Sequence, residues 1–201
     1  MKINIVETGL FKLDGGAMFG VVPKKLWNKL NPADDQNMCT WSMRSILIET
    51  DNRKILVDTG LGDKQSEKFF SYFHPHGEDS LVKSLAKLNL TTADITDVFL
   101  THLHFDHDGG AVKKDGDTLV PTFENATYWS NEVHFKWAFD PNDREKASFL
   151  KENFVPLKNH KVLEFIDVKQ DINWIPNIDI RYLEVLLLLP PFLYPKLRSH
   201  L

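Results

Sequence analysis

The amino-acid sequence predicts an α/β fold, and three adjacent features near the middle of the chain carry that prediction. Residues 80–88 have the apolar spacing of an amphipathic helix. Residues 97–101 form a short, nearly continuous apolar run, which is typical of a strand buried on both faces. A polar loop rich in histidine and aspartate, residues 102–110, follows directly. This order is typical of α/β proteins, whose chemistry lies at the carboxyl ends of buried strands.

The other elements follow from local patterns. Alternating apolar residues predict the first strand, Gly15 and Gly16 end it, and a turn at Asp51 and Asn52 joins two strands as a hairpin. Ser80 is a suitable N-cap for the helix at 80–88, and Pro141 separates two later helices. The expected strands are residues 3–11, 18–22, 44–49, 54–57, 97–101, 126–129, 162–166 and 178–183. The expected helices are residues 80–88, 130–139 and 144–153.

The composition is that of one soluble globular domain over residues 1–201. With 42% hydrophobic and 26% charged residues, the chain can build a sizeable core and is not disordered, collagenous or coiled-coil. The net charge of -4 and the absence of a long lysine or arginine run argue against a nucleic-acid partner.

Two features bear on location. The single cysteine, Cys39, cannot form an internal disulfide, and residues 1–7 lack the apolar core of a secretory signal, so we expect a cytoplasmic protein. The longest apolar stretch, residues 185–194, is interrupted by Pro190 and Pro191 and is about half of the roughly 20 residues that a spanning helix needs. We therefore expect no membrane span and no membrane partner.

The strongest motif is His-x-His-x-Asp-His at residues 102–107, directly after a predicted buried strand. Residues i and i+2 of an extended segment point the same way, so His102 and His104 can bind one metal ion while Asp106 and His107, after a turn, face a second. Imidazole and carboxylate ligands suit Zn²⁺ first, with Fe or Mn as alternatives. The sequence therefore predicts a site for two zinc ions.

A pair of metal ions at this position indicates hydrolysis. Two ions lower the pKa of a bridging water and polarise a carbonyl or phosphoryl oxygen. Asp106 would bind metal and also orient the water or pass a proton to the leaving group. Asp58, at the end of the neighbouring strand, is placed to accept a hydrogen bond from a ligand imidazole, although a turn or helix-capping role is an equal alternative.

The other histidines have simpler interpretations. Pro75 and Gly77 surround His74 and His76, which predicts a surface loop. His134 and His160 are expected to be structural or solvated rather than metal ligands.

At the motif the sequence resembles the metallo-β-lactamase fold superfamily, in the branch that contains N-acyl-homoserine lactonases. The similarity extends over residues 94–110, 56–60, 14–20 and 127–130. It implies a four-layer αββα sandwich and two metals that hydrolyse an ester, lactone, thioester or phosphodiester of a small-molecule substrate through a metal-bound water. It also implies that His102 and His104 bind the first metal, that Asp106 and His107 bind the second, and that Asp58 supports them.

The sequence departs from that family after residue 183. Family members have a Gly-His-Thr segment, a bridging aspartate and a last histidine, whereas residues 184–201 form an atypical apolar tail without them, in which only His200 offers an imidazole. We expect a fold that is incomplete at the C-terminus, weaker metal binding, and an exposed apolar patch that favours a homo-oligomer. A truncated or frame-shifted, catalytically incomplete fragment is therefore one alternative, and a phosphodiesterase of the same fold is another.

Overall fold

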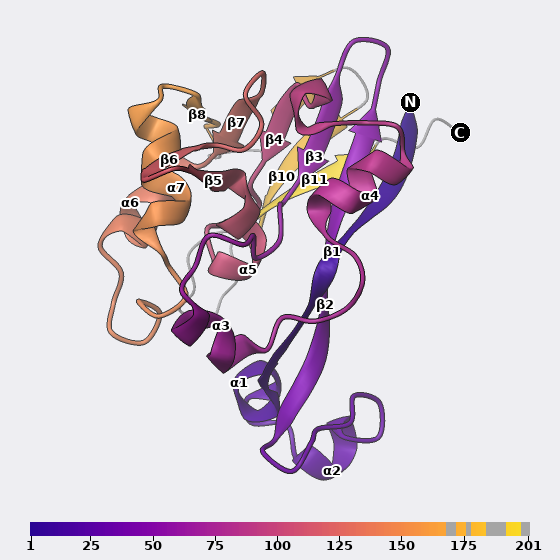
Figure 1. The fold of residues 1–201 in the computed structure, drawn as a ribbon, viewed down its shortest axis with the longest axis vertical. Coiled ribbons are helices and arrows are strands. Elements are labelled where there is room, and N and C mark those ends of the chain that lie inside the picture. Colours follow the sequence, from indigo (N-terminus) through magenta and orange to yellow (C-terminus); the bar gives the residue numbers. More distant parts are fainter. Residues whose placement is uncertain (168–171, 176–177, 184–191, 198–201) are drawn as a thin grey trace.

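The computed structural model describes residues 1–167, 172–175, 178–183 and 192–197. Within these ranges the strands form one sheet of six strands, one of three and one of two (Figure 1). The strands are β1 (Lys2–Asp14), β2 (Met38–Glu49), β3 (Lys54–Val57), β4 (Asp97–Phe99), β5 (Val112–Asp115), β6 (Thr118–Pro121), β7 (Thr127–Ser130), β8 (Leu163–Phe165), β9 (Ile172–Ile175), β10 (Ile178–Leu183) and β11 (Phe192–Leu197).

Along the chain, the helices fall in the connections between the strands of the six-stranded sheet. They are α1 (Gly15–Phe19), α2 (Lys24–Trp27), α3 (Glu67–Phe73), α4 (Leu81–Lys87), α5 (Phe105–Asp108), α6 (Glu132–Phe139) and α7 (Lys151–Asn159), with the 3-10 turns η1 (Thr92–Asp94) and η2 (Gly109–Ala111). In the described part of the chain, none of them is long and apolar enough to cross a membrane.

The six-stranded sheet has the order β1-β2-β3-β4-β7-β8. Its first three strands are antiparallel, and β3, β4, β7 and β8 are parallel. The predicted hairpin is confirmed, with Ile46 opposite Val57, and so is the buried strand β4, all three of whose residues are buried. Because β3 and β4 are parallel neighbours, the residues that follow them leave the sheet at the same edge.

One face of this sheet is covered by helices. Val98 of β4 and Leu56 of β3 are fully buried there, against Leu85 of α4, Phe135 of α6 and Phe154 of α7. The predicted N-cap is confirmed, because the Ser80 side chain accepts from the Lys83 amide. The expected apolar face of α4 is correct except at Val82, whose side chain is 60% exposed.

The opposite face of the sheet packs against the three-stranded sheet, whose order is β11-β10-β9. Ile55, Val57 and Phe99 alternate with the residues that face the helices, as the two-residue period of a strand requires, and they contact Ile178 and Ile180 of β10. Helices, the six-stranded sheet and the three-stranded sheet are three of the four layers expected for an αββα sandwich.

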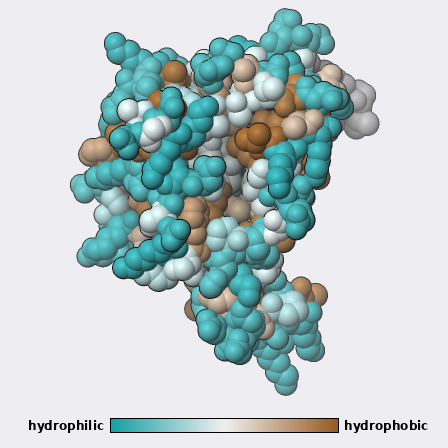
Figure 2. All heavy atoms as spheres, in the orientation of Figure 1, coloured by the Kyte–Doolittle hydropathy of each residue, from teal (hydrophilic) through white to brown (hydrophobic). Residues whose placement is uncertain are grey.

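The long hairpin of β1 and β2 projects from the body as an arm, residues 10–42, with α1 and α2 at its end (Figure 1). Hydrophobic side chains are visible on this arm among hydrophilic ones (Figure 2), and Val21 and Leu30 are at least 90% exposed. The strand expected at residues 18–22 is wrong. The Asp14 side chain accepts hydrogen bonds from the amides of Gly16 and Ala17 and so begins helix α1 instead.

Two further expectations are corrected. A helix was expected at residues 144–153, but it begins only at Lys151, because Asn142 accepts hydrogen bonds from the amides at 144 and 145 and holds that segment in turns. The apolar tail, residues 184–201, was expected to lack partners, but residues 192–197 form β11 and pair with β10. His200 lies outside the described residues.

Candidate metal centre

The motif lies at the carboxyl edge of the six-stranded sheet. Asp58 follows β3, and its amide donates to the Phe99 carbonyl at the end of β4, 2.9 Å away. Thr101 and His102 follow one residue after the end of β4, beyond Leu100. Asp58 has φ 58°, a left-handed conformation that aspartate tolerates better than most residues. The adjacent ends of two parallel strands thus bring Asp58 to the histidine motif, 44 residues further along the chain.

Three of the predicted metal ligands are histidines whose rings lie against one another. The ring centroids of His102 and His104 are 4.6 Å apart, and those of His102 and His107 are 3.9 Å apart. The chain turns into helix α5 directly after His104, which brings Asp106 to the same place. One oxygen of the Asp106 carboxylate lies 3.5 Å from His107 Nε2. All four predicted ligands are therefore neighbours.

Asp58 orients two of these imidazoles. Its Oδ2 atom accepts a hydrogen bond from His107 Nδ1 at 2.9 Å, so Nε2 of that ring faces Asp106. Its two oxygens also accept from the amide and the hydroxyl of Thr101. Because the Thr101 hydroxyl donates to Asp58, it accepts from His102 Nδ1 at 3.1 Å, which places the lone pair of a neutral His102 ring on Nε2. Asp58 thus determines which nitrogen of each ring carries hydrogen.

Burial and charge separate the protonation states of the three rings. Burial lowers the pKa of His102 well below its ordinary value, and burial also lowers the pKa of His104. Burial acts in the same direction on His107, but the hydrogen bond and the charge of Asp58, with the charge of Asp106, raise the pKa of His107 to about 9. Two rings are therefore neutral at pH 7, which is the state that binds metal, and His107 must release a proton to bind one.

The donor chemistry of this cluster fits a metal ion, because neutral imidazoles and a carboxylate are the ligands that zinc prefers. In the part of the chain that the structure describes, however, no group of three or more His, Cys, Asp or Glu side chains is arranged to hold one ion.

Backbone contacts with the loop that follows β3 support the motif. The amide and hydroxyl of Thr59 both donate to the His107 carbonyl, at 2.7 and 2.9 Å, and the Gly110 amide donates to the Gly60 carbonyl at 3.0 Å. A Cβ on Gly109 would overlap the Leu61 carbonyl, so glycine is required there. The residues after β3 and the residues after His107 therefore run in direct backbone contact.

His134, which was expected to be structural or solvated rather than a metal ligand, lies beside this motif in a structural role. It is 1% exposed on α6, and its Nε2 accepts a hydrogen bond from the Leu103 amide, between two predicted ligands, at 2.9 Å. Burial lowers the pKa of His134 to about 3, so the ring is a neutral acceptor. The available signal was that α6 follows β7, the parallel neighbour of β4, so its first turns begin at the same sheet edge. The exposed residues His74, His76 and His160 form hydrogen bonds with residues outside the motif.

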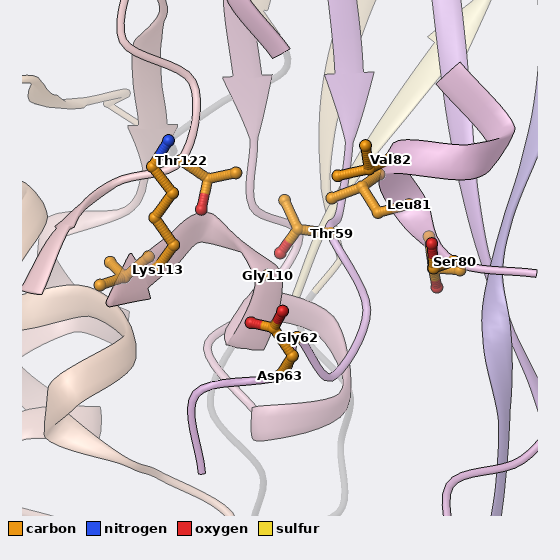
Figure 3. A pocket seen from close by; sticks show the side chains of 11 residues that line it. Thr59, Gly62, Asp63, Ser80, Leu81, Val82, Gly110, Lys113 and Thr122 are labelled. Atoms are coloured by element: carbon orange, nitrogen blue, oxygen red, sulfur yellow. The ribbon is translucent and has the colours of Figure 1, made fainter. Parts of the chain in front are cut away.

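Two cavities adjoin the motif. One of about 170 Å³ is bordered by Asp58, Asp106 and His107 and has Phe11 and Met43 in its wall. Another of about 200 Å³ lies beside Gly110 and has none of the predicted ligands in its wall (Figure 3). The labelled residues of that second cavity are Thr59, Gly62, Asp63, Ser80, Leu81, Val82, Gly110, Lys113 and Thr122.

The fold and this histidine cluster define an α/β protein with a candidate metal centre at the edge of a sheet. The family model of the metallo-beta-lactamase superfamily matches residues 44–184, and the chain belongs to that superfamily. An N-acyl homoserine lactonase of Bacillus thuringiensis is 26% identical over 163 residues, which are 76% of this chain and 56% of the relative. The chain thus spans about half the length of the curated relatives it matches.

Solved structures agree on the fold. A "probable metal-dependent hydrolase" from Staphylococcus aureus superposes with a TM-score of 0.80 at 34% identity, covering 90% of this chain and 63% of that one. AidC, a dizinc quorum-quenching lactonase in complex with a product, superposes with a TM-score of 0.70 at 20% identity, covering 98% of this chain and 67% of that one. These similarities confirm the predicted metallo-β-lactamase fold and connect it with hydrolases that use metal ions.

Proposed function

We propose that this chain is a lactonase-like, metal-dependent hydrolase that cleaves an ester, lactone or related bond of a small molecule. The observation that carries the proposal is the 2.9 Å hydrogen bond from His107 Nδ1 to Asp58, which leaves Nε2 of that ring facing Asp106. This is the arrangement in which a carboxylate behind a histidine orients it as a metal ligand. The hydrolases among the similar proteins support the same reaction class.

In this proposal His102 and His104 hold one metal ion, and Asp106 and His107 hold a second. Zinc is the preferred metal, with Fe or Mn as alternatives, because the donors are imidazole nitrogens and a carboxylate. When bound, the ions lower the pKa of a coordinated water to near neutral and polarise the substrate carbonyl. The superfamily and a dizinc neighbour support metal ions as the cofactors.

The residues of this chain supply the rest of the chemistry. The Asp106 carboxylate is 25% exposed, so one of its oxygens can take the proton of the attacking water and deliver it to the leaving oxygen. Asp58 holds His107 and, through Thr101, His102 in a single tautomer. Phe11 and Met43, in the wall of the cavity beside Asp106, offer an apolar surface for the acyl part of a substrate.

One observation favours a second candidate, a catalytically incomplete protein that binds metal weakly. Catalytic zinc sites have three protein ligands, and within the described residues no three candidate ligands converge. In that case the motif persists without turnover. The two candidates differ in metal content and in hydrolytic rate.

The experiment that separates them is elemental analysis of the purified 201-residue chain after zinc loading and desalting. We expect close to two metals per chain, lost in His102→Ala and His104→Ala and kept in His160→Ala, an exposed histidine used as the control. Hydrolysis of an N-acyl homoserine lactone and of a simple ester is measured alongside, with Asp106→Ala expected to lower the rate at least about 100-fold. Metal content near zero, or a rate unaffected by Asp106→Ala, contradicts the proposal.

The remaining proposals concern partners and location. We infer a small-molecule substrate, because a similar lactonase was solved with a small-molecule product. The net charge of -4 argues against a nucleic-acid partner, and the shortness of the longest apolar stretch, residues 185–194, argues against a membrane partner. A homo-oligomer is proposed from the exposed apolar residues Val21 and Leu30 at the end of the arm. A cytoplasmic location is supported by the single cysteine, Cys39, which is buried and free.

A further inference from the structure

Lys64 is a buried lysine beneath the proposed ligand segment. Lys64 is 5% exposed and lies in the loop that follows β3. Its ammonium group donates a hydrogen bond to the carbonyl of Gly109. Gly109 is the C-cap of α5 and lies two residues after His107.

The residue before Gly109 in the chain, Asp108, carries a buried carboxyl group. Asp108 is fully buried, and one of its oxygens accepts a hydrogen bond of 2.7 Å from the side chain of Asn153 on α7. Asn153 in turn accepts from Gln65, the residue after Lys64, at 3.1 Å. The charge of Asp108 raises the pKa of Lys64 against the larger effect of burial, which lowers it to about 8. Lys64, Asp108 and Asn153 thus join the loop after β3, helix α5 and helix α7.

Burial of a lysine costs several kcal/mol unless the charge is compensated, so an apolar residue would fill the same place at lower cost. An apolar side chain, however, cannot donate a hydrogen bond to the Gly109 carbonyl. Two residues that precede Lys64 in the same loop add to this contact. Thr59 already takes the His107 carbonyl, and a Cβ on Gly62 would lie 2.6 Å from the Gly109 oxygen, so the two segments pack backbone on backbone. Figure 3 shows Thr59 and Gly62 beside Gly110.

We propose that Lys64 is a positioning residue, whose hydrogen bond to the Gly109 carbonyl holds the segment 105–110 in its binding conformation before any metal arrives. The consequence for metal affinity rests on the proposed function. The consequence for the metal-free segment does not, because it depends only on contacts within the chain.

The test compares Lys64→Met with Lys64→Arg and with Lys68→Met, which changes an exposed lysine of the nearby helix α3. In the presence of EDTA, hydrogen exchange by mass spectrometry is measured on peptides that cover residues 105–111. The amides of His107 and Asp108 donate to the His104 carbonyl. We expect these amides to exchange at least tenfold faster in Lys64→Met, to be partly restored in Lys64→Arg, and to be unchanged in Lys68→Met, with exchange of β3 and β4 unaffected.

Zinc affinity is measured on the same proteins by titration with a chromophoric chelator. We expect Lys64→Met to weaken zinc binding 10- to 100-fold, as loss of a supporting contact does in other metal sites. Unchanged exchange in Lys64→Met overturns the positioning role. Faster exchange in a protein that binds no zinc, wild type included, supports the positioning role and overturns the proposed function instead.

Lys64→Met also removes a positive charge that partly offsets the burial of the Asp108 carboxyl group, and this loss can unfold the protein altogether. The double variant Lys64→Met with Asp108→Asn removes both charges and keeps an amide at the position bonded to Asn153. This variant still lacks a donor to the Gly109 carbonyl, so we expect it to fold and to retain the fast exchange of residues 105–111. Wild-type exchange in this double variant overturns the proposal.

Discussion

Asp58 shows how much of the candidate site depends on one residue. It has a left-handed backbone, it directly follows β3, and it accepts hydrogen bonds from both Thr101 and His107. The sequence predicted a hydrogen bond to an imidazole from its place at a strand end. It did not predict the contact with Thr101, because that contact depends on β3 and β4 being parallel neighbours.

Asp58→Asn tests this role at nearly constant shape, since asparagine also tolerates a positive φ. Without the carboxylate charge, burial dominates, and we expect the pKa of His107 to fall from about 9 to below its ordinary value. Zinc affinity is expected to fall 10- to 100-fold. NMR titration of the imidazoles in metal-free protein and a zinc titration measure the two effects. Asp51→Asn, in the exposed turn of the hairpin, is the control, and an unchanged His107 titration in Asp58→Asn would contradict this role.

Tyr128 gives a pH dependence whose sign follows from its environment. Its hydroxyl is buried, donates to the Ala111 carbonyl at 3.1 Å and accepts from the Phe123 amide at 2.9 Å. Burial raises the pKa of Tyr128 far above 10.0. The unfolded chain therefore loses this proton near pH 10 while the folded chain keeps it, and the free energy of unfolding falls as the pH rises above 10.

Tyr128→Phe removes the phenol hydroxyl and with it this pH dependence of the free energy of unfolding. Urea unfolding between pH 7 and 11 should show the variant to be about 1–3 kcal/mol less stable at pH 7, because the Phe123 amide loses its acceptor. Above pH 10 the wild type should lose about 1.4 kcal/mol per pH unit more than the variant, so the two curves converge. Curves that stay parallel to pH 11 would show that the phenol ionises equally in both states.

At the scale of elements, the sequence predicted those whose signal is local. The hairpin of β2 and β3, strand β4, strand β10 and the N-cap of α4 all follow from turn residues, apolar runs and a serine. The strand expected at 18–22 failed because a capping side chain outweighed an apolar run. The hairpin of β5 and β6 was not predicted, because its sequence is mostly polar and exposed and lacks the alternation that indicates a strand.

Gly109→Ala tests the contact between the elements on either side of the motif. Gly109 has a helical backbone, with φ -56°, so alanine is allowed there by conformation and excluded only by the Leu61 carbonyl. We expect a loss of about 3 kcal/mol or more in urea unfolding, together with weaker zinc binding. Gly116→Ala is the matched control, because it has φ 58° and open space, and should cost about 1 kcal/mol without affecting zinc. Equal losses in the two variants would mean that the backbone contact yields easily.

At the scale of the whole molecule, the sequence identified the segment that carries the site but not what surrounds it. The ligand residues of the motif all lie within residues 102–107, so the motif can be recognised from the sequence without a structure. Lys64 and His134 reach the same segment from a loop and a helix on opposite sides of it in the sequence. No local pattern marks a lysine in a loop as buried, and a histidine on an amphipathic helix has many simpler interpretations.

The packing of the two sheets determines whether the described part of the chain unfolds as one unit. Ile180 of β10 is 1% exposed and lies in the cluster with Phe99 and Val57, the residues that end β4 and β3. Ile180→Ala should therefore lower the free energy of unfolding by about 2–5 kcal/mol, while Ile3→Ala, 47% exposed on the edge strand β1, should change it by less than about 0.5 kcal/mol.

Hydrogen exchange in Ile180→Ala shows whether the two sheets unfold together, because it identifies the strands that lose protection. Because the ends of β3 and β4 carry Asp58 and Thr101, a cavity beneath them should speed exchange in β3, β4 and β10 together, with a single urea transition. Loss of protection confined to β9 and β10 would make the three-stranded sheet a separate unit. In that case the six-stranded sheet alone would support the candidate metal centre.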